Sequence, residues 1–203
     1  MKSVVCSLSK LIDGGIKLEL FKTPLGEARW FKCLGEARKA YDDGKPDEWT
    51  MELLHDETDK GVKDWYDSME DKFYELHGKD AKKHTYWFNC FPDKEDPTKS
   101  VTKFKKICWV NDNGTKTVGP NVIDSTCEKW PANKEIGNGS KVIVGYNIKK
   151  WGRKDGCGMT FDPVKIMVMD YVEYSGGSVP SDDEFFGNVQ GGYSLKEDAE
   201  KAF

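Results

Sequence analysis

Residues 141–172 read KVIVGYNIKKWGRKDGCGMTFDPVKIMVMDYV, and this stretch decides the fold. From Lys141 to Trp151 it is rich in β-branched and aromatic residues that recur at period two, which predicts a strand. Residues 153–158 predict a glycine-rich turn, and residues 159–174 predict one or two further strands with a bend at Asp162-Pro163. The C-terminal end of the folded part, residues 141–174, is therefore predicted to be β-structure.

Working outward toward the N-terminus, short β-prone runs recur about every ten residues. Turn signals separate them, such as the Thr23-Pro24-Leu25-Gly26 stretch and the Asn111-Asp112-Asn113-Gly114 hairpin signal. The predicted strands are residues 16–21, 28–34, 48–54, 83–90, 101–110 and 119–124.

The spacing of apolar residues changes in residues 58–77. Their apolar positions recur every three or four residues, which predicts an amphipathic helix with an acidic outer face. Thr58 or Asp59 can cap its N-terminus, and Gly78 can end it. The apolar positions are Val62, Trp65, Tyr66, Met69, Phe73 and Leu76.

Many short strands with one helix predict a mainly β protein built on a small closed barrel. A β-sandwich with a helical insertion fits the same pattern. From Ser175 the composition changes to Gly, Ser, Pro and acidic residues without a period, which indicates a disordered tail. We expect one folded domain over residues 1–177 and a flexible acidic tail over residues 178–203.

Charge is strongly segregated along the chain. Residues 181–203 carry six acidic residues and two lysines, so the tail accounts for the whole net charge of −4. Residues 42–80 hold fourteen acidic residues and five lysines, whereas residues 99–154 hold twelve basic and four acidic residues. A local basic stretch that also carries aromatic residues points to nucleic acid as a ligand.

Lysines and aromatic residues interleave on two of the predicted strands. Lys103, Lys105 and Trp109 share one face of residues 101–110, and Phe104 and Lys106 share the other. Cations of this kind neutralise successive phosphates, and aromatic rings stack on unpaired bases of any identity. The candidate DNA-binding residues are Trp30, Tyr86, Phe88, Lys103, Lys105, Lys106, Trp109, Lys149, Lys150, Trp151, Arg153 and Lys154. The competing interpretation is that the aromatic residues are core and that the lysines protect strand edges.

The end of the chain combines an acidic cluster, Asp182, Asp183 and Glu184, with a terminal Phe203. An acidic tail can compete with DNA for a basic groove, and a terminal phenylalanine can enter an apolar pocket on a partner. These four residues are therefore candidates for partner docking.

Cysteines and histidines give no metal motif. The six cysteines contain no CxxC spacing, and the three histidines are not spaced as ligands with them, so we expect reduced thiols, no metal and no cofactor. No apolar run reaches the length of a membrane span, and no signal peptide is recognised, which predicts an intracellular protein without a membrane partner.

The order of segments resembles the OB-fold single-stranded DNA-binding proteins of phage replication systems. The similar segments are residues 28–54, the helix at 58–77, residues 119–124, residues 139–151, the turn at 156–158 and the strand from 159 to 172. The resemblance implies a five-stranded OB barrel with extra strands and an inserted helix, which binds single-stranded DNA in its groove. It also implies dimerisation in some members, contact of the tail with polymerase and helicase, a role in replication and recombination, and a location in the cytoplasm of the infected host cell.

Two other functions remain open at this point. Paired acidic residues, Asp42/Asp43 and Asp182/Asp183, are a weak hint of a Mg²⁺-dependent nuclease, but a turn and a tail hold carboxylates poorly. No catalytic motif is found, so we expect a protein that is not an enzyme. A β-domain for protein interaction or virion association, with its aromatic residues in the core, is the second alternative.

Overall fold

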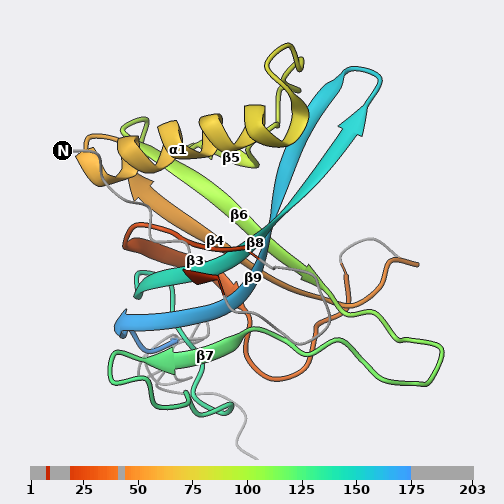
Figure 1. The fold of residues 1–203 in the computed structure, drawn as a ribbon. Coiled ribbons are helices and arrows are strands. Elements are labelled where there is room, and N and C mark those ends of the chain that lie inside the picture. The colour runs from red at the N-terminus through yellow and green to blue at the C-terminus, as the bar shows by residue number, and fades with distance from the viewer. Residues whose placement is uncertain (1–7, 10–18, 41–43, 175–203) are drawn as a thin grey trace, which may run out of the picture.

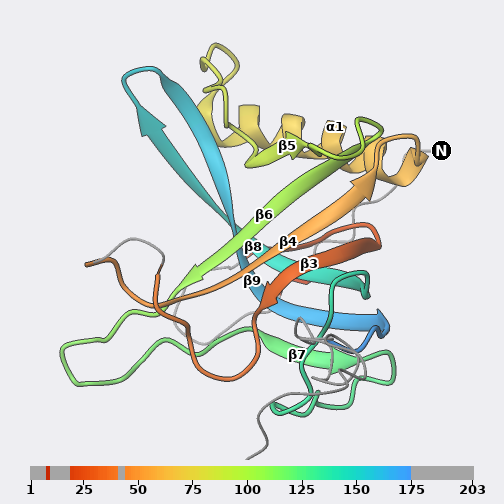
Figure 2. The ribbon, with the colours of Figure 1, turned by 180° about the vertical axis from the view of Figure 1, so that it is seen from behind.

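The computed structural model describes residues 8–9, 19–40 and 44–174, which form nine strands and one helix. In Figures 1 and 2 the strands wrap into a barrel, and the helix lies across one end. The elements are β1 (Leu8–Ser9), β2 (Glu19–Lys22), β3 (Gly26–Lys32), β4 (Glu48–Asp56), α1 (Lys60–His77), β5 (Cys90–Pro92), β6 (Lys99–Ile107), β7 (Asn121–Asp124), β8 (Lys141–Arg153) and β9 (Gly156–Asp170).

Five of the strands close on themselves in the order β3-β4-β6-β9-β8-β3. All neighbours are antiparallel except β6 and β9, which run parallel and pair at Phe104 and Phe161. Closure removes the open edges of the five central strands. The extra strands extend this barrel: β2 pairs with β8, β7 with β9 and β5 with β6. The expected five-stranded barrel with extra strands is confirmed.

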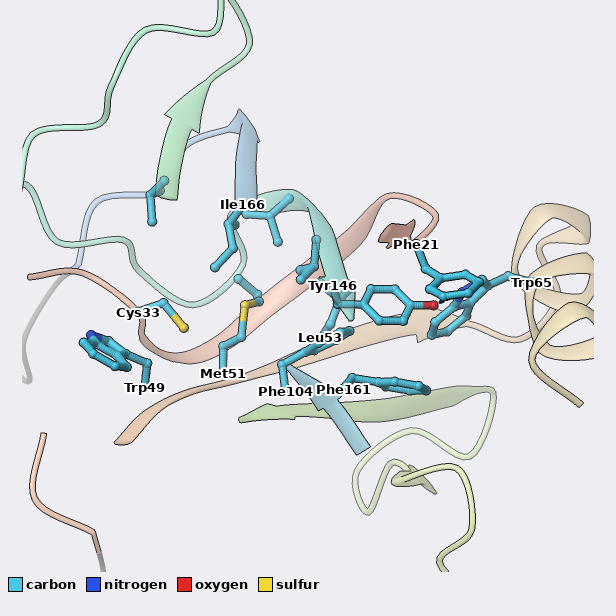
Figure 3. Packing of buried hydrophobic residues seen from close by; sticks show 14 of the residues in the cluster. Phe21, Cys33, Trp49, Met51, Leu53, Trp65, Phe104, Tyr146, Phe161 and Ile166 are labelled. Atoms are coloured by element: carbon cyan, nitrogen blue, oxygen red, sulfur yellow. Dashed lines mark hydrogen bonds between the residues drawn. The ribbon is translucent and has the colours of Figure 1, made fainter. Parts of the chain in front are cut away.

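Alternation along the strands fills the barrel. Met51 and Leu53 of β4, Phe104 of β6 and Tyr146 of β8 point inward and are at most 1% exposed. Figure 3 shows these side chains meeting Phe161 in one continuous cluster. Residues between them in sequence point outward, which leaves the outer face of the same strands available for polar side chains.

Helix α1 begins and ends as its sequence predicts. The Asp59 side chain accepts hydrogen bonds from the backbone N–H groups of Gly61 and Val62, and the Gly78 N–H donates to the Tyr74 carbonyl. The helix buries one apolar stripe against the barrel, and the indole N–H of Trp65 donates to the Tyr146 hydroxyl at 2.9 Å. The helix therefore covers the barrel end, and its acidic side faces away from it.

One expectation needs correction. Residues 83–89 do not form a strand but a series of turns between α1 and β5, with a single parallel bridge at Lys83, and only Cys90 belongs to a strand, as the first residue of β5. The run 159–174 contains one strand, the first of the two predicted alternatives: β9 continues through Asp162-Pro163, and a register shift lies opposite them, between Gly145 and Tyr146. The bulge lets one long strand bend around the barrel.

Residues 175–203 lie outside the described residues, and with them the predicted tail, the acidic cluster and Phe203. Asp42 and Asp43 also lie outside them. In the described part of the chain, no helix is both long enough and apolar enough to cross a membrane.

Candidate nucleic-acid interface

The hairpin formed by β8 and β9 extends beyond the barrel wall (Figure 1). Both strands are long, 13 and 15 residues, and their pairing continues without a break from Tyr146 to Arg153, opposite Gly156. The turn at the tip consists of Lys154 and Asp155 alone. A hairpin of this length carries its end residues away from the core and leaves them free to contact a ligand.

Backbone hydrogen bonds hold the hairpin against the segment that follows α1. The Cys157 N–H donates to the Lys82 carbonyl at 2.9 Å, and the His84 N–H donates to the Cys157 carbonyl at 3.0 Å. Gly156 permits this approach, because a Cβ atom there would lie 2.7 Å from the His84 nitrogen. A side-chain contact of 2.9 Å between His84 Nε2 and an Asp155 carboxylate oxygen closes the tip.

A pocket of about 280 Å³ lies between the hairpin and this segment. We call it the hairpin pocket; its lining residues are His84, Tyr86, Asn89, Trp151, Gly152, Arg153 and Thr160. The Trp151 ring lies over Gly158, where any Cβ would clash with it at 2.2 Å. The His84 ring contacts both aromatic walls, with centroids 5.3 Å from Trp151 and 5.6 Å from Tyr86. Tyr86 is 54% exposed, so its ring is available to a planar ligand.

Cations surround the hairpin pocket on the outer face of the barrel. The Arg153 guanidinium lies over the Trp151 ring at 5.2 Å from its centroid. Lys103 and Lys105 of β6 and Lys149 of β8 are exposed, on outward positions. Because Phe104 pairs with Phe161, and Lys149 with Thr160, these three lysines flank β9 on the same face. We call Lys103, Lys105, Lys149 and Arg153 the basic face.

The basic face continues to the rim of the pocket through β5 and the residue before it. The Asn89 side chain donates to the Lys103 carbonyl at 2.8 Å, and Asn89 also lines the pocket. The Lys103 ammonium lies 5.5 Å from the Phe91 ring centroid, and Phe91 in turn contacts Tyr86 at 5.3 Å. Cations and aromatic rings thus alternate over one surface, an arrangement that suits a chain of phosphates with unpaired bases.

The structure brings together six of the twelve residues predicted to bind DNA. These are Tyr86, Lys103, Lys105, Lys149, Trp151 and Arg153. Lys154 lies next to them in the exposed turn at the hairpin tip. The alternation predicted along β6 is confirmed, because Phe104 is buried while Lys103 and Lys105 are exposed.

The prediction that Phe88 binds DNA is wrong. It is 7% exposed and packs against Trp65, Tyr66 and Phe161, so its ring belongs to the core and cannot stack on a base. Two predicted lysines, Lys150 and Lys106, do not lie on the basic face. Lys150 donates to the Leu76 carbonyl at 3.4 Å, on the α1 side of the hairpin.

Lys106 pairs in register with the buried Trp49, and it is partly buried itself. Its charge lies close enough to the Cys33 thiol to lower the pKa of that group slightly, whereas burial raises it far more. The sequence alternation predicts Lys106 on the face opposite to Lys105, and the structure agrees. It therefore does not join the basic face.

Trp30 and Trp109 are exposed but lie away from the hairpin pocket. Trp30 is 64% exposed at a bulge of β3, where its backbone has a φ of 49° and its N–H donates to the Asn138 side chain. Trp109 is 54% exposed in the loop after β6, where its N–H donates to Thr117 Oγ1. Neither ring contacts another aromatic ring within the described residues.

Sequence reasoning missed four residues of this surface: His84, Asn89, Phe91 and Thr160. The aromatic run 83–90 was the available signal, but its exposed and buried rings do not alternate as on a strand. The five cysteines among the described residues are free. In this part of the chain no three His, Cys, Asp or Glu side chains lie close enough together to hold a metal ion.

The strand order and the inserted helix define this protein as an OB-fold domain, a five-stranded barrel whose outer face commonly binds oligonucleotides and oligosaccharides. No family model matches the chain, and no curated protein matches it in sequence.

Three solved structures are similar to this chain in fold. Gp2.5, a single-stranded DNA-binding protein encoded by bacteriophage T7, is similar with a TM-score of 0.57 and 19% identity, over 87% of this chain and 98% of that one. The single-stranded DNA-binding protein from bacteriophage Enc34 in complex with single-stranded DNA is similar with a TM-score of 0.59 and 15% identity, over 85% and 99%. Its C-terminal truncation gives 0.58 and 15%, over 86% and 99%. The chain therefore has the fold of these phage proteins, as the resemblance predicted.

Proposed function

We propose that this protein binds single-stranded DNA without sequence preference and acts in phage DNA replication and recombination. The observation that carries the proposal is the hairpin pocket with the basic face beside it. Its two aromatic walls suit base stacking, and the adjacent cations suit the phosphates that join successive bases. The structures that share the fold are named single-stranded DNA-binding proteins, and one of them was determined with that ligand.

The positions of these residues suggest a path for the bound strand. A base stacked in the hairpin pocket would place its phosphates near Arg153 and Lys149, and the next nucleotides would cross β9 toward Lys103 and Lys105 on β6. Phe91, which contacts both Tyr86 and Lys103, lies between the two ends of this path. Trp30 and Trp109 remain candidates for contacts farther along the strand.

Substitution of Tyr86 tests the proposal directly. The change Tyr86→Ala removes one stacking ring, worth about 1–3 kcal/mol per base, so the affinity for oligo(dT) should fall about 5- to 150-fold. Quenching of tryptophan fluorescence by oligo(dT), reversed by added salt, measures this because the seven tryptophans remain in place. Tyr174→Ala is the matched control, since Tyr174 is 52% exposed and lines a different pocket.

Two results would count against the function. One is an unchanged fluorescence signal with poly(dT) at low salt, together with no mobility shift of labelled DNA. The other is an equal loss of affinity in the Tyr86 and Tyr174 variants, because that would show that the hairpin pocket has no specific part in DNA binding.

The remaining parts of the proposal concern organisation and partners. We infer a DNA-binding domain over residues 1–177 followed by a tail, with Asp182, Asp183, Glu184 and Phe203 docking polymerase and helicase. Dimerisation, a location in the cytoplasm of the infected cell and the absence of enzymatic activity belong to the same proposal. They follow from the sequence resemblance and from the composition of the chain end.

A further inference from the structure

Each lysine of the basic face is held by a carboxylate of a neighbouring strand. Lys103 lies 3.1 Å from a Glu52 carboxylate oxygen, and Lys105 forms an ion pair with Glu48. Lys149 lies 2.5 Å from a carboxylate oxygen of Asp162. Three of the four cations that the proposed function assigns to phosphate therefore already have anionic partners in the free protein.

The strand register fixes where these carboxylates stand. Glu52 is directly opposite Lys103 in the β4–β6 ladder, and Glu48 is two residues beyond Thr50, the partner of Lys105. On the other side, Asp162 is two residues beyond Thr160, the partner of Lys149. The backbone of all three acids thus belongs to the barrel wall, and their low exposure limits how far the side chains can move when a ligand arrives.

The exposures of the two partners are unequal in every pair. The lysine side chains are 52, 44 and 61% exposed, whereas the side chains of Glu52, Glu48 and Asp162 are 25, 17 and 11% exposed. A long, exposed lysine can swing to a phosphate at little cost in packing. The carboxylate that it leaves stays in place without its counterion.

Asp162 is the most deeply buried of the three carboxylate residues. The residue is 8% exposed, and its second oxygen is buried with no hydrogen-bond partner among the described residues. Lys149 therefore supplies the main compensation for a carboxylate that water reaches poorly. When Lys149 binds a phosphate, the Asp162 carboxylate loses its counterion, and this lowers the net free energy of DNA binding.

We propose that Glu48, Glu52 and Asp162 act as built-in competitors of nucleic-acid phosphate, setting how tightly the basic face holds single-stranded DNA and how steeply that affinity depends on salt. The inference rests on the proposed function. Its physical content is an exchange, in which each lysine leaves a fixed carboxylate for a mobile phosphate. The competition keeps binding reversible without any change of fold.

The exchange has two measurable consequences. The pairs of the exposed Lys103 and Lys105 contribute about 0.2–1 kcal/mol each, so breaking these two should weaken DNA binding by about 2- to 30-fold, and the buried Asp162 adds to this loss. A freed carboxylate also attracts a cation from solution, which offsets the counterion released from DNA. Single strands release about 0.7 cation per neutralised phosphate, so the offset reaches about 2 in the salt slope for three lysines.

The test replaces the three acids by their amides in the full chain: Glu48→Gln, Glu52→Gln and Asp162→Asn. We expect binding to oligo(dT) at low salt to tighten by at least the factor given for the two exposed pairs, and the plot of log affinity against log salt to become steeper. The matched control is Asp64→Asn, Asp67→Asn and Asp71→Asn on α1, which changes the net charge equally but lies away from the basic face. Because Asp162 is buried, the Glu48→Gln, Glu52→Gln double variant is measured beside the triple variant and should show part of the same gain.

The outcomes separate this inference from the function on which it rests. If the wild-type protein binds oligo(dT) and the double and triple variants bind no tighter than the control, the competitor role is wrong while DNA binding stands. If the wild-type protein, the control and both variants all fail to bind, the proposed function itself is wrong. A gain confined to the β4 and β9 substitutions, with a steeper salt slope, supports the exchange.

Discussion

Gly156 offers a way to open the hairpin pocket without removing any of its rings. Its backbone has a φ of 152°, and a Cβ atom at this position would lie 2.7 Å from the nitrogen and 2.8 Å from the Cα of His84. Both contacts are with backbone, so no side chain can rotate away to relieve them. The change Gly156→Ala should therefore push the hairpin away from residues 82–84.

The cost can be worked from the contacts that the shift disturbs. In the closed hairpin an alanine at this position adds about 1–3 kcal/mol for its backbone conformation and about 1–3 kcal/mol for overlap with the His84 backbone. The two backbone hydrogen bonds of Cys157 are lost only when the hairpin opens, so they oppose opening by about 0.5–1.5 kcal/mol each. The closed hairpin should thus lose about 2–6 kcal/mol relative to an open one. Once the open form dominates, every further 1.4 kcal/mol lowers the population that can bind, and hence the affinity, tenfold. We expect at least a tenfold loss of affinity for oligo(dT).

Three measurements check this expectation: fluorescence titration with oligo(dT), thermal unfolding, and hydrogen exchange at the amides of His84 and Cys157. The control is Gly145→Ala in β8, outside the hairpin pocket, where a Cβ atom would meet the Lys165 carbonyl oxygen at an ordinary 3.4 Å. The reasoning is refuted if exchange shows that the two hydrogen bonds are lost while Gly156→Ala still binds oligo(dT) as tightly as Gly145→Ala.

Two further predictions concern stability. Burial lowers the pKa of His55 from 6.5 to about 4, so the folded state favours the neutral ring. The contribution of this group to the free energy of unfolding is therefore fully present above pH 6.5 and is lost as the pH falls toward 4. Urea unfolding should show about 2–3 kcal/mol of acid destabilisation at pH 4.5 that His55→Asn lacks, and equal slopes in the two proteins would contradict the assignment. Tyr146→Phe removes the acceptor of the Trp65 indole N–H and should cost about 1–3 kcal/mol in the free energy of unfolding. Tyr171→Phe, which loses an exposed bond to the Glu135 carbonyl, should cost clearly less, and similar losses in both variants would show that the buried N–H finds another acceptor.

The local features of the chain could be predicted from the sequence because they depend on neighbours in sequence. Asp59 and Gly78 bound the helix through bonds to residues at most four positions away. The alternation of Lys103, Phe104 and Lys105 needs only the two-residue period of a strand. The segregation of basic residues into the part of the chain that forms β6 and the hairpin is likewise a property of residue order alone.

Tertiary contacts decided which of these residues share a surface. Residues 83–90 are equally aromatic throughout, yet packing buries Phe88 and exposes Tyr86, because the segment turns where a strand would alternate. The parallel pairing of β6 with β9 brings Lys103 and Lys105 beside Lys149, more than 40 positions away in the chain. No local pattern encodes that pairing.

The sequence by itself determined the element types, the helix caps and the charge distribution, since each is set by backbone propensity and short-range periodicity. The closed barrel alone decided the hairpin pocket and the carboxylates facing the basic lysines. These depend on register between strands that meet only after the chain has folded, and a shift of one residue would turn every lysine of the basic face inward.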